Sequence, residues 1–383
     1  MLKYLFLVEL FLLTSFAVHA GQPSNYYVGL SMDFVPYLEK KGIVYKDNGK
    51  PKDPFESIKD HGANIVRLTV MFPPFETEHS KGQPPVDWGS FENVTENIRR
   101  AKKYGLNVFL TFTYKGFGEH KIHNTAPKEW AHISDANVLE KKVYQYTYEK
   151  LKFLGKENLL PEFVSIGNEI NTDFLAPVQK QDYALDAKRN ALLINAGLQA
   201  VKDISKTYDK DIKTAMHLFA PEHIKWWVEQ HWPAGLKNFD VIAVSYYYGW
   251  HKMGQWESFE QLIGWLKTEY NKEFIILETS SPWTNKTSDK RINIFGNVPP
   301  GYPNPPTKAG QKKYLTDLTR EVIAAGGLGV IYWGGEWVGS DIYVFPDKYG
   351  KGSSWENNTF WDFDNNLHEG IDWMMEDYSR LNK

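Results

Sequence analysis

The chain of 383 residues contains no cysteine, which excludes disulfide bridges and a lipid-modified cysteine after a cleaved leader. Its fold must therefore be stabilised by its core, and a chain of this length can bury a large one. An excess of basic charge is also lacking, because 44 Lys and Arg against 47 Asp and Glu give a net charge of −3. Without a basic footprint, we expect no nucleic-acid partner.

Long apolar runs are lacking beyond the N-terminus, so we expect no membrane span in the mature chain. The N-terminal run over residues 4–16 is mostly apolar but short, and Glu9 interrupts it. A membrane anchor is the alternative interpretation, yet the Val-His-Ala sequence at 18–20 fits the small-residue rule for signal-peptide cleavage. We therefore predict a signal peptide over residues 1–20, a mature chain over residues 21–383, and export to the extracellular space or the periplasm.

No linker-like or low-complexity stretch divides the mature chain, so we expect a single domain, and a monomer. Aromatic residues are abundant, with 14 Trp, 22 Tyr and 22 Phe making up 15% of the chain. Aromatic side chains build cores, and they also stack on the apolar faces of sugar rings. The composition is therefore compatible with a carbohydrate ligand.

Short apolar, β-branched segments recur along the mature chain, and longer amphipathic segments separate them. The eight candidate strands read YYVGLSMD, NIVRLTVMF, LNVFLTFTY, EFVSIGNE, IKTAMHLFA, DVIAVSYYY, EFIILETSS and GLGVIYWGG. Helical patterns lie at residues 94–104, 138–154, 184–208, 259–270 and 308–325. Alternating strands and helices predict an α/β fold, and eight repeats predict a closed (β/α)8 TIM barrel. An open doubly wound sheet is disfavoured because no glycine-rich phosphate fingerprint follows the first strand.

The active site of such a barrel lies at the carboxyl ends of its strands, so the polar residues there are the candidates. They are Asp33, Arg67, Tyr114, Asn168, Glu169, His217, Ser245, Tyr246, Tyr247, Glu278 and Trp333. Each has an ordinary alternative, such as a solvated loop residue, a structural ion pair, a core histidine or an aromatic plug. Their joint occurrence at the strand ends of one barrel favours an active site. The loop at residues 282–308, rich in proline and glycine, is expected to be a functional loop at the same end.

Two carboxylic acids that face one cleft are what cleavage of a glycosidic bond requires. Glu169 is predicted to be the acid/base, because the adjacent Asn168 can hold the sugar 2-hydroxyl. Glu278 is predicted to be the nucleophile, kept ionised by Arg67 and oriented by a hydrogen bond from Tyr247. Carboxyl groups about 5–5.5 Å apart would make the reaction one that retains configuration.

Five motifs in this order resemble glycoside hydrolase family 53, the arabinogalactan endo-β-1,4-galactanases, within a large clan of retaining (β/α)8 glycosidases. The segment from GLSMDF to NIVRLTV is similar to the family's first strand, its G-x-x-Y-x-D-x-x-G insert and its N-x-V-R-L strand. VSIGNEI resembles the acid/base motif, DVIAVSYYYGWH the S-Y-Y-P-x-W-H motif, IILETSSPWT the nucleophile strand, and GGLGVIYWGGEWV the final Y-W-E-P-x-W strand. The resemblance covers nearly the whole mature chain.

The resemblance implies a secreted, retaining endo-β-1,4-galactanase that acts on galactan or arabinogalactan, with a polysaccharide as its partner and no cofactor. It implies Glu169 and Glu278 as catalytic residues. The expected substrate-binding residues are Asp33, Arg67, Tyr114, Asn168, His217, Tyr247 and Trp333. Tyr247 is preferred to Tyr246 because strand alternation puts it on the face of Ser245, where the clan has its sixth-strand tyrosine.

The sequence departs from the family pattern in the segment after the third strand. There the family carries His-Tyr-Ser-Asp-x-Trp-Ala-Asp-Pro, whereas TYKGFGEHK keeps only the tyrosine, with Thr113, Lys115, Gly116, Gly118 and His120 replacing the other residues. Elsewhere Tyr248 replaces the proline of the sixth strand, and Gly334 and Gly335 replace the Glu-Pro of the eighth. Hydrolysis of a β-glycoside is therefore better supported than galactan as its substrate.

Two alternatives stay open at this point. One is the same machinery acting on another β-linked polysaccharide, such as a mannan or a β-glucan. The other is a non-catalytic carbohydrate-binding protein, although a pure binder has no need of either acid. Some bacterial members of the family hold calcium in the loop after the seventh strand. Here that loop has Asp289 and few other acids, so no metal is predicted.

Overall fold

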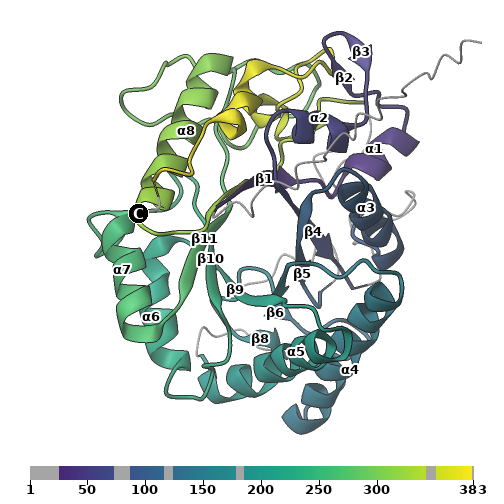
Figure 1. Ribbon diagram of the computed structural model, residues 1–383, viewed down its shortest axis with the longest axis vertical. Helices are drawn as coiled ribbons and strands as arrows, with labels where there is room; N and C mark the ends of the chain where they lie inside the picture. The colour runs from purple at the N-terminus through teal and green to yellow at the C-terminus, as the bar shows by residue number, and fades with distance from the viewer. Residues whose placement is uncertain (1–25, 73–86, 116–123, 178–184, 342–350, 382–383) are drawn as a thin grey trace, which may run out of the picture.

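Eight parallel strands close into a barrel at the centre of the computed structural model, which describes residues 26–72, 87–115, 124–177, 185–341 and 351–381 (Figure 1). The strands are β1 (Tyr27–Ser31), β4 (Ile65–Val70), β5 (Asn107–Phe112), β7 (Phe163–Ile166), β9 (Lys213–Phe219), β10 (Val241–Ser245), β11 (Glu273–Glu278) and β12 (Gly329–Tyr332). Their order around the barrel is β1-β12-β11-β10-β9-β7-β5-β4, and β4 pairs with β1. Each lies within one predicted strand, so the predicted TIM barrel is confirmed.

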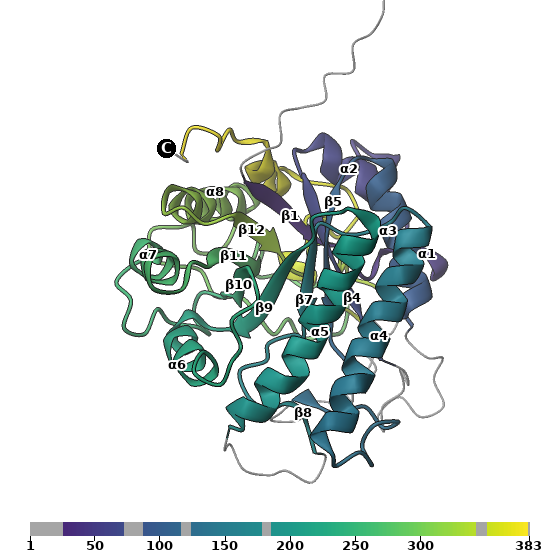
Figure 2. The ribbon, with the colours of Figure 1, turned by 60° about the horizontal axis from the view of Figure 1, so that its bottom comes forward.

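Helices surround the barrel and connect its strands. They are α1 (Val35–Lys40), α2 (Pro54–Asp60), α3 (Phe91–Lys103), α4 (Ala136–Lys156), α5 (Ala187–Tyr208), α6 (Pro221–His231), α7 (Phe259–Tyr270) and α8 (Lys308–Ala324). The longest two, α4 and α5, pack side by side along one flank (Figure 2). Five of these helices coincide with the predicted helical segments, whereas α1, α2 and α6 were not singled out.

Polar side chains set where several helices begin. Ser90 accepts a hydrogen bond from the backbone N–H of Asn93 at the start of α3, and Asp135 does the same for Asn137 in α4. Such caps satisfy N–H groups that have no partner within the helix. They explain why both helices begin two to three residues before the predicted positions of 94 and 138.

The segment after β12 differs from a regular eighth repeat. Described residues 351–381 contain no α-helix, and they form the 3₁₀ helices η2 (Glu356–Asn358) and η3 (Glu369–Met375). The second of these packs against α8, as the yellow segment beside the green helix in Figure 1 shows. Two small sheets complete the fold, one of β2 (Lys46–Asp47) and β3 (Lys50–Pro51), the other of β6 (Asn124–Thr125) and β8 (Phe174–Ala176).

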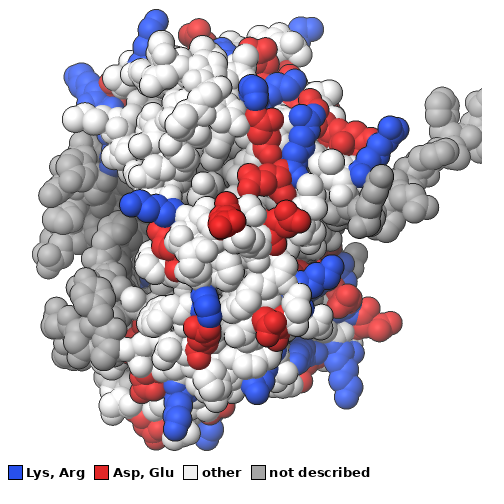
Figure 3. All heavy atoms as spheres, turned by 90° about the vertical axis from the view of Figure 1, so that its left-hand side faces the viewer, with Lys and Arg blue, Asp and Glu red and all other residues white. Residues whose placement is uncertain are grey.

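The surface carries charges of both signs. On the face drawn in Figure 3, acidic and basic side chains are interspersed, and the basic ones form no continuous patch. Among the described residues, no helix combines the length and apolar character needed to cross a bilayer. The predicted signal peptide at residues 1–20 lies outside the described residues, as do Gly116, Gly118 and His120 of the altered segment.

Candidate active site

The interior of the barrel changes from apolar to polar along its strands. Residues two apart on a strand face the same side, so each inward position is followed by another, one layer nearer the carboxyl end. The lower inward positions include Ile65, Phe109, Phe163, Ala215 and Ala243. Two residues further on stand Arg67, Thr111, Ser165, His217 and Ser245, each at most 1% exposed. The strand period therefore places a polar layer directly above an apolar plug, at the barrel end expected for the active site.

Glu278 reaches this polar layer because of an irregularity in strand pairing. Val244 of β10 pairs with Ile276 of β11, but Ser245 pairs with Glu278, so the register shifts by one residue. Leu277 belongs to the apolar interior cluster. The shift brings the carboxylate of Glu278 level with Ser245, although strict alternation would put Glu278 on the opposite face from Leu277.

Glu169 reaches the same place through a turn after β7. Gly167 has a φ of 90°, and a Cβ there would come within 2.4 Å of a side-chain carbon of Ile170. Glu169 itself is left-handed, with a φ of 51°, which costs a non-glycine residue about 1 kcal/mol or more. Backbone hydrogen bonds from Gly167 to Phe112 and from Ile170 to His217 hold the turn between β5 and β9. The strained conformation is thus fixed by its surroundings.

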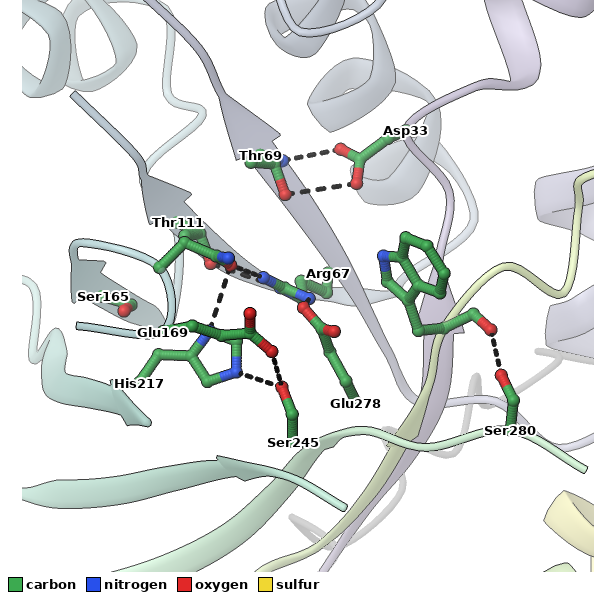
Figure 4. A network of polar contacts seen from close by, with 12 residues as sticks. Asp33, Arg67, Thr69, Thr111, Ser165, Glu169, His217, Ser245, Glu278 and Ser280 are labelled. Atoms are coloured by element: carbon green, nitrogen blue, oxygen red, sulfur yellow. Dashed lines mark hydrogen bonds and ion pairs between the residues drawn. The ribbon is translucent and has the colours of Figure 1, made fainter. Parts of the chain in front are cut away.

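The two carboxyl groups come together at the centre of a polar network. Ligand-type atoms of Glu169, His217 and Glu278 all lie within 4.8 Å of one another, and Figure 4 shows these side chains converging beside Arg67. Arg67 forms an ion pair with Oε1 of Glu278. The hydroxyl of Tyr247 donates to Oε2 of the same carboxylate at 2.9 Å. Both oxygens of Glu278 are therefore held in place.

The environment of Glu169 favours its protonated form. Burial and the neighbouring Glu278 carboxylate raise the pKa of Glu169 from its ordinary value of 4.5 to about 7. A carboxyl group with such a pKa can hold a proton at neutral pH and release it to a substrate.

His217 on β9 connects the turn after β7, which carries Glu169, to β10. Its Nδ1 lies 3.1 Å from Oδ1 of Asn168, and its Nε2 lies 2.9 Å from Oγ of Ser245. Burial and the positive charges of Arg67 and Lys115 lower the pKa of His217 well below its ordinary value, so the ring is neutral. Glu169, His217 and Glu278 are also the residues here that could hold a metal ion. Because both ring nitrogens already have hydrogen-bond partners, the arrangement suits proton handling better than metal binding.

Of the predicted substrate-binding residues, Arg67, Asn168 and Tyr247 lie beside the acids. Asp33 and His217 lie behind them, with 3% and 0% of their surface exposed. Asp33 accepts hydrogen bonds from the backbone N–H and the hydroxyl of Thr69 (Figure 4). Burial raises the pKa of Asp33 to about 7, although Arg67 opposes the shift. Both residues hold neighbouring protein groups in place, since Asp33 binds Thr69 and His217 contacts Asn168 and Ser245.

The structure does not support the prediction that Tyr114 binds substrate. Its side chain is 1% exposed, and its hydroxyl lies 2.6 Å from Oγ1 of Thr147 in α4. Its ring packs against Phe174 and Tyr146. Tyr114 has a left-handed backbone, with a φ of 55°, and its side chain belongs to the packing between barrel and helix.

A group of aromatic residues adjoins Tyr247. Trp333, at the end of β12, lies with its ring centroid 6.5 Å from that of Tyr247 and 4.9 Å from that of Trp355. Phe295, from the loop at 282–308, stacks on Trp355, and Trp250 packs on both and is 46% exposed. The loop after β11 therefore contributes directly to the surroundings of the acids. No sequence pattern indicated Trp355, which lies 22 residues beyond Trp333 in the chain.

Packing explains the first of the two glycines that replace Glu-Pro after β12. Gly334 has a φ of 76°, and a Cβ at this position would lie 2.4 Å from a ring carbon of Trp355. Only glycine combines this backbone conformation with such a close approach. The replacement therefore lets Trp355 pack against the turn.

Glu336, in the turn after β12, is fully buried. It was not among the candidate residues predicted from the sequence. Its Oε1 accepts from the backbone N–H of Phe34 at 3.4 Å, and its Oε2 has no hydrogen-bond partner among the described residues. Burial and the nearby Asp33 raise the pKa of Glu336 well above its ordinary value. The folded protein therefore holds this carboxyl in its protonated form.

Replacing Glu336 by glutamine is expected to stabilise the protein at neutral and alkaline pH. Because the pKa is raised by folding, the carboxyl contributes its stability below its unfolded pKa and loses it as the pH rises toward the folded value. Over that interval the variant should gain about 1.4 kcal/mol per pH unit in its free energy of unfolding relative to the wild type. Urea unfolding at pH 4, 6 and 8 measures the trend. A difference that does not change with pH would contradict it.

Comparison with known proteins agrees with the geometry of the site. The family model described as glycosyl hydrolase family 53 matches residues 27–374. An arabinogalactan endo-beta-1,4-galactanase from Cellvibrio japonicus (strain Ueda107) is 36% identical over 346 residues, covering 88% of this chain and 86% of its own. An endo-beta-1,4-galactanase from Bacillus subtilis (strain 168) is 27% identical, covering 83% of this chain and 72% of its own.

A solved structure gives the same assignment. The Ignisphaera aggregans GH53 catalytic domain superposes with a TM-score of 0.79 at 28% identity, covering 93% of this chain and 97% of that domain. The order of motifs, the closed barrel and the matched length all agree. The chain is therefore a glycoside hydrolase that belongs to glycosyl hydrolase family 53, as its motifs predicted.

Proposed function

We propose that the protein is an endo-β-1,4-galactanase that hydrolyses galactan or arabinogalactan with retention of configuration, with Glu169 as acid/base and Glu278 as nucleophile. The observation that carries this proposal is the approach of a carboxyl oxygen of Glu169 to within 4.8 Å of one of Glu278. Retaining glycosidases have carboxyl groups about 5–5.5 Å apart, whereas inverting ones need about 6.5–9.5 Å to admit a water. The short separation supports covalent catalysis.

In the first step the Glu278 carboxylate attacks the anomeric carbon, and the bond from that carbon to the leaving oxygen breaks. Glu169 transfers its proton to the leaving oxygen. Asn168 acts on the same sugar. Its Oδ1 accepts from Arg67 at 2.5 Å and faces His217, so its amide N–H groups are available for the 2-hydroxyl. That hydrogen bond strengthens as charge develops on the sugar.

In the second step a water attacks the anomeric carbon of the glycosyl-enzyme. Glu169, now ionised, takes a proton from the water, and the ester bond to Glu278 breaks. The ion pair with Arg67 and the hydrogen bond from Tyr247 stabilise the carboxylate of Glu278 as it is released. The aromatic residues around Trp333 offer apolar faces against which sugar rings can stack.

The substrate class follows from the relatives, because those from Cellvibrio japonicus and Bacillus subtilis are both named as endo-β-1,4-galactanases. We infer that the protein acts on a polysaccharide outside the cytoplasm, after removal of residues 1–20, and as a monomer.

The proposal is tested by the products of hydrolysis. Proton NMR of a freshly started reaction on β-1,4-galactan should show new reducing ends first as the β-anomer, before mutarotation. First appearance of the α-anomer would rule out Glu278 as the nucleophile of a double displacement. A panel with arabinogalactan, β-mannan and β-glucan tests the substrate. Cleavage of another polymer with galactan untouched would overturn the substrate assignment, and galactan binding without any new reducing ends would overturn catalysis.

A further inference from the structure

The hydroxyl group of Ser245 lies between two groups that can both accept its hydrogen. Its Oγ is 2.7 Å from Oε1 of Glu169 and 2.9 Å from Nε2 of His217 (Figure 4). A serine hydroxyl has one hydrogen, so it can donate to only one of these partners at a time. Which partner receives it depends on the protonation states of Glu169 and His217.

The orientation of Asn168 determines which nitrogen of His217 carries the hydrogen. Arg67 has only donors, so the Asn168 atom 2.5 Å from its Nη2 must be the amide oxygen. The same oxygen lies 3.1 Å from Nδ1 of His217, which must therefore carry a hydrogen and donate it. In the neutral ring Nε2 is then an acceptor. Among the described residues, Nε2 has the hydroxyl of Ser245 as its hydrogen-bond partner, so the ring competes with Glu169 for that hydrogen.

We propose that Ser245 is a two-position hydrogen-bond donor, held by His217, that donates to His217 while Glu169 is protonated and to Glu169 once that carboxyl is ionised. This inference rests on the proposed function of Glu169 as acid/base. It makes Ser245 and His217 positioning residues, because they act on the reaction through Glu169.

The switch suits a group that must act as an acid and then as a base. While Glu169 holds its proton, His217 is the better acceptor for the serine hydrogen, and the carboxyl group keeps its proton for the leaving oxygen. After that proton has been transferred, the new negative charge on Glu169 attracts the serine hydrogen. Hydrogen bonds to an ionised acceptor are roughly twice as strong as neutral ones, so the exchange favours the ionised carboxylate at the step that needs it.

Other charged and titratable groups also act on Glu169. They come from the strands that surround it, and they are Arg67 on β4, Lys115 after β5, Tyr247 after β10 and Glu278 on β11. None of these groups is itself changed when Ser245 or His217 is substituted. A change in the pH profile of such a variant therefore reports on the serine–histidine pair.

Two substitutions should move the pH profile in opposite directions. Ser245→Ala removes the donor that stabilises ionised Glu169, so the alkaline limb of kcat/KM on galactan should move up by about one pH unit. His217→Asn keeps an N–H near the position of Nδ1 for Asn168 but removes the competing acceptor. The serine hydrogen is then committed to Glu169, and the limb should move down by about one pH unit.

His217→Gln is the matched variant, because its side-chain oxygen can occupy the position of Nε2. It restores an acceptor for Ser245, so its alkaline limb should return toward that of the wild type. If thermal unfolding shows that one variant is not folded, the direction in which the alkaline limb moves in the other variants tests the inference. A purely structural role for Ser245 and His217 would lower kcat/KM equally at all pH values.

Shifts in the same direction, or no shift in any folded variant, would overturn the inference. The proposed function fails separately. If Glu169→Gln retains wild-type activity with an unchanged alkaline limb, Glu169 is not the acid, whatever the serine and histidine variants show. If Glu169→Gln is inactive on galactan while the limbs of the serine and histidine variants stay fixed, only the switch is wrong.

Discussion

Replacing Glu278 by alanine is expected to lower kcat on galactan by about 10⁴-fold or more, because the substitution removes the proposed nucleophile. Arg67 and Tyr247 hold the two oxygens of this carboxylate, and both would lose that contact. Initial rates of reducing-end release on β-1,4-galactan measure the loss. A thermal unfolding curve shows whether the variant is folded.

Glu273→Ala is the matched control for this experiment. Glu273 lies on the same strand as Glu278 but at its amino end, where it is partly exposed and paired with Lys213. Loss of a surface ion pair lowers the free energy of unfolding by about 1 kcal/mol at most. The activity of this variant should therefore stay near that of the wild type. Azide supplies a further check, because a small anion can act in place of the carboxylate that Glu278→Ala removes. Its attack on an activated β-galactoside would yield the α-galactosyl azide. Wild-type activity in Glu278→Ala would end the assignment of the nucleophile.

Replacing Glu169 by glutamine is expected to lower activity on galactan by about 10²–10⁴-fold, the usual contribution of general acid–base catalysis. The wild type should lose kcat/KM as the pH rises through about 7, because the acid must be protonated and the pKa of Glu169 is about 7. The variant should lack this limb. Measurement of kcat/KM between pH 5 and 9 compares the two enzymes.

The leaving group provides the control for Glu169→Gln. Dinitrophenolate departs from a dinitrophenyl galactoside without protonation, so the first step on this substrate should be nearly as fast in the variant as in the wild type. The second step still lacks its base, and the glycosyl-enzyme on Glu278 should accumulate and appear in an intact-mass spectrum. Equal loss of rate on galactan and on the activated substrate, with no accumulating intermediate, would contradict the role of Glu169.

The barrel could be predicted from the sequence because its signals are local. Each strand is a short apolar run, each helix a longer amphipathic one, and their alternation specifies parallel pairing. The same periodicity placed Arg67 and His217 on inward positions, and motif order identified the family. Helix starts were less accurate, since caps such as Ser90 lie outside the apolar repeat.

Other features could not be read from the same patterns. The sequence put Tyr114 at a strand end with the candidates, but the left-handed backbone of this residue and a hydrogen bond to α4 take it into the core. Ser245 was visible at its strand end, yet its contact with both Glu169 and His217 depends on three strands. Trp355 and Glu336 come from the segment after β12, where no repeat indicates their position.

The sequence by itself determined which residues stand at the ends of the strands, since a period of two and a fixed strand order follow from local composition and chain connectivity. The tertiary structure alone decided how those ends meet. The two acids come together because of three tertiary features. These are the register shift opposite Ser245, the left-handed turn at Glu169, and the contacts of Arg67 with both Glu278 and Asn168. The physical reason is that the distance between two carboxyl groups and the partner of each proton depend on packing between segments far apart in the chain, which no local pattern encodes.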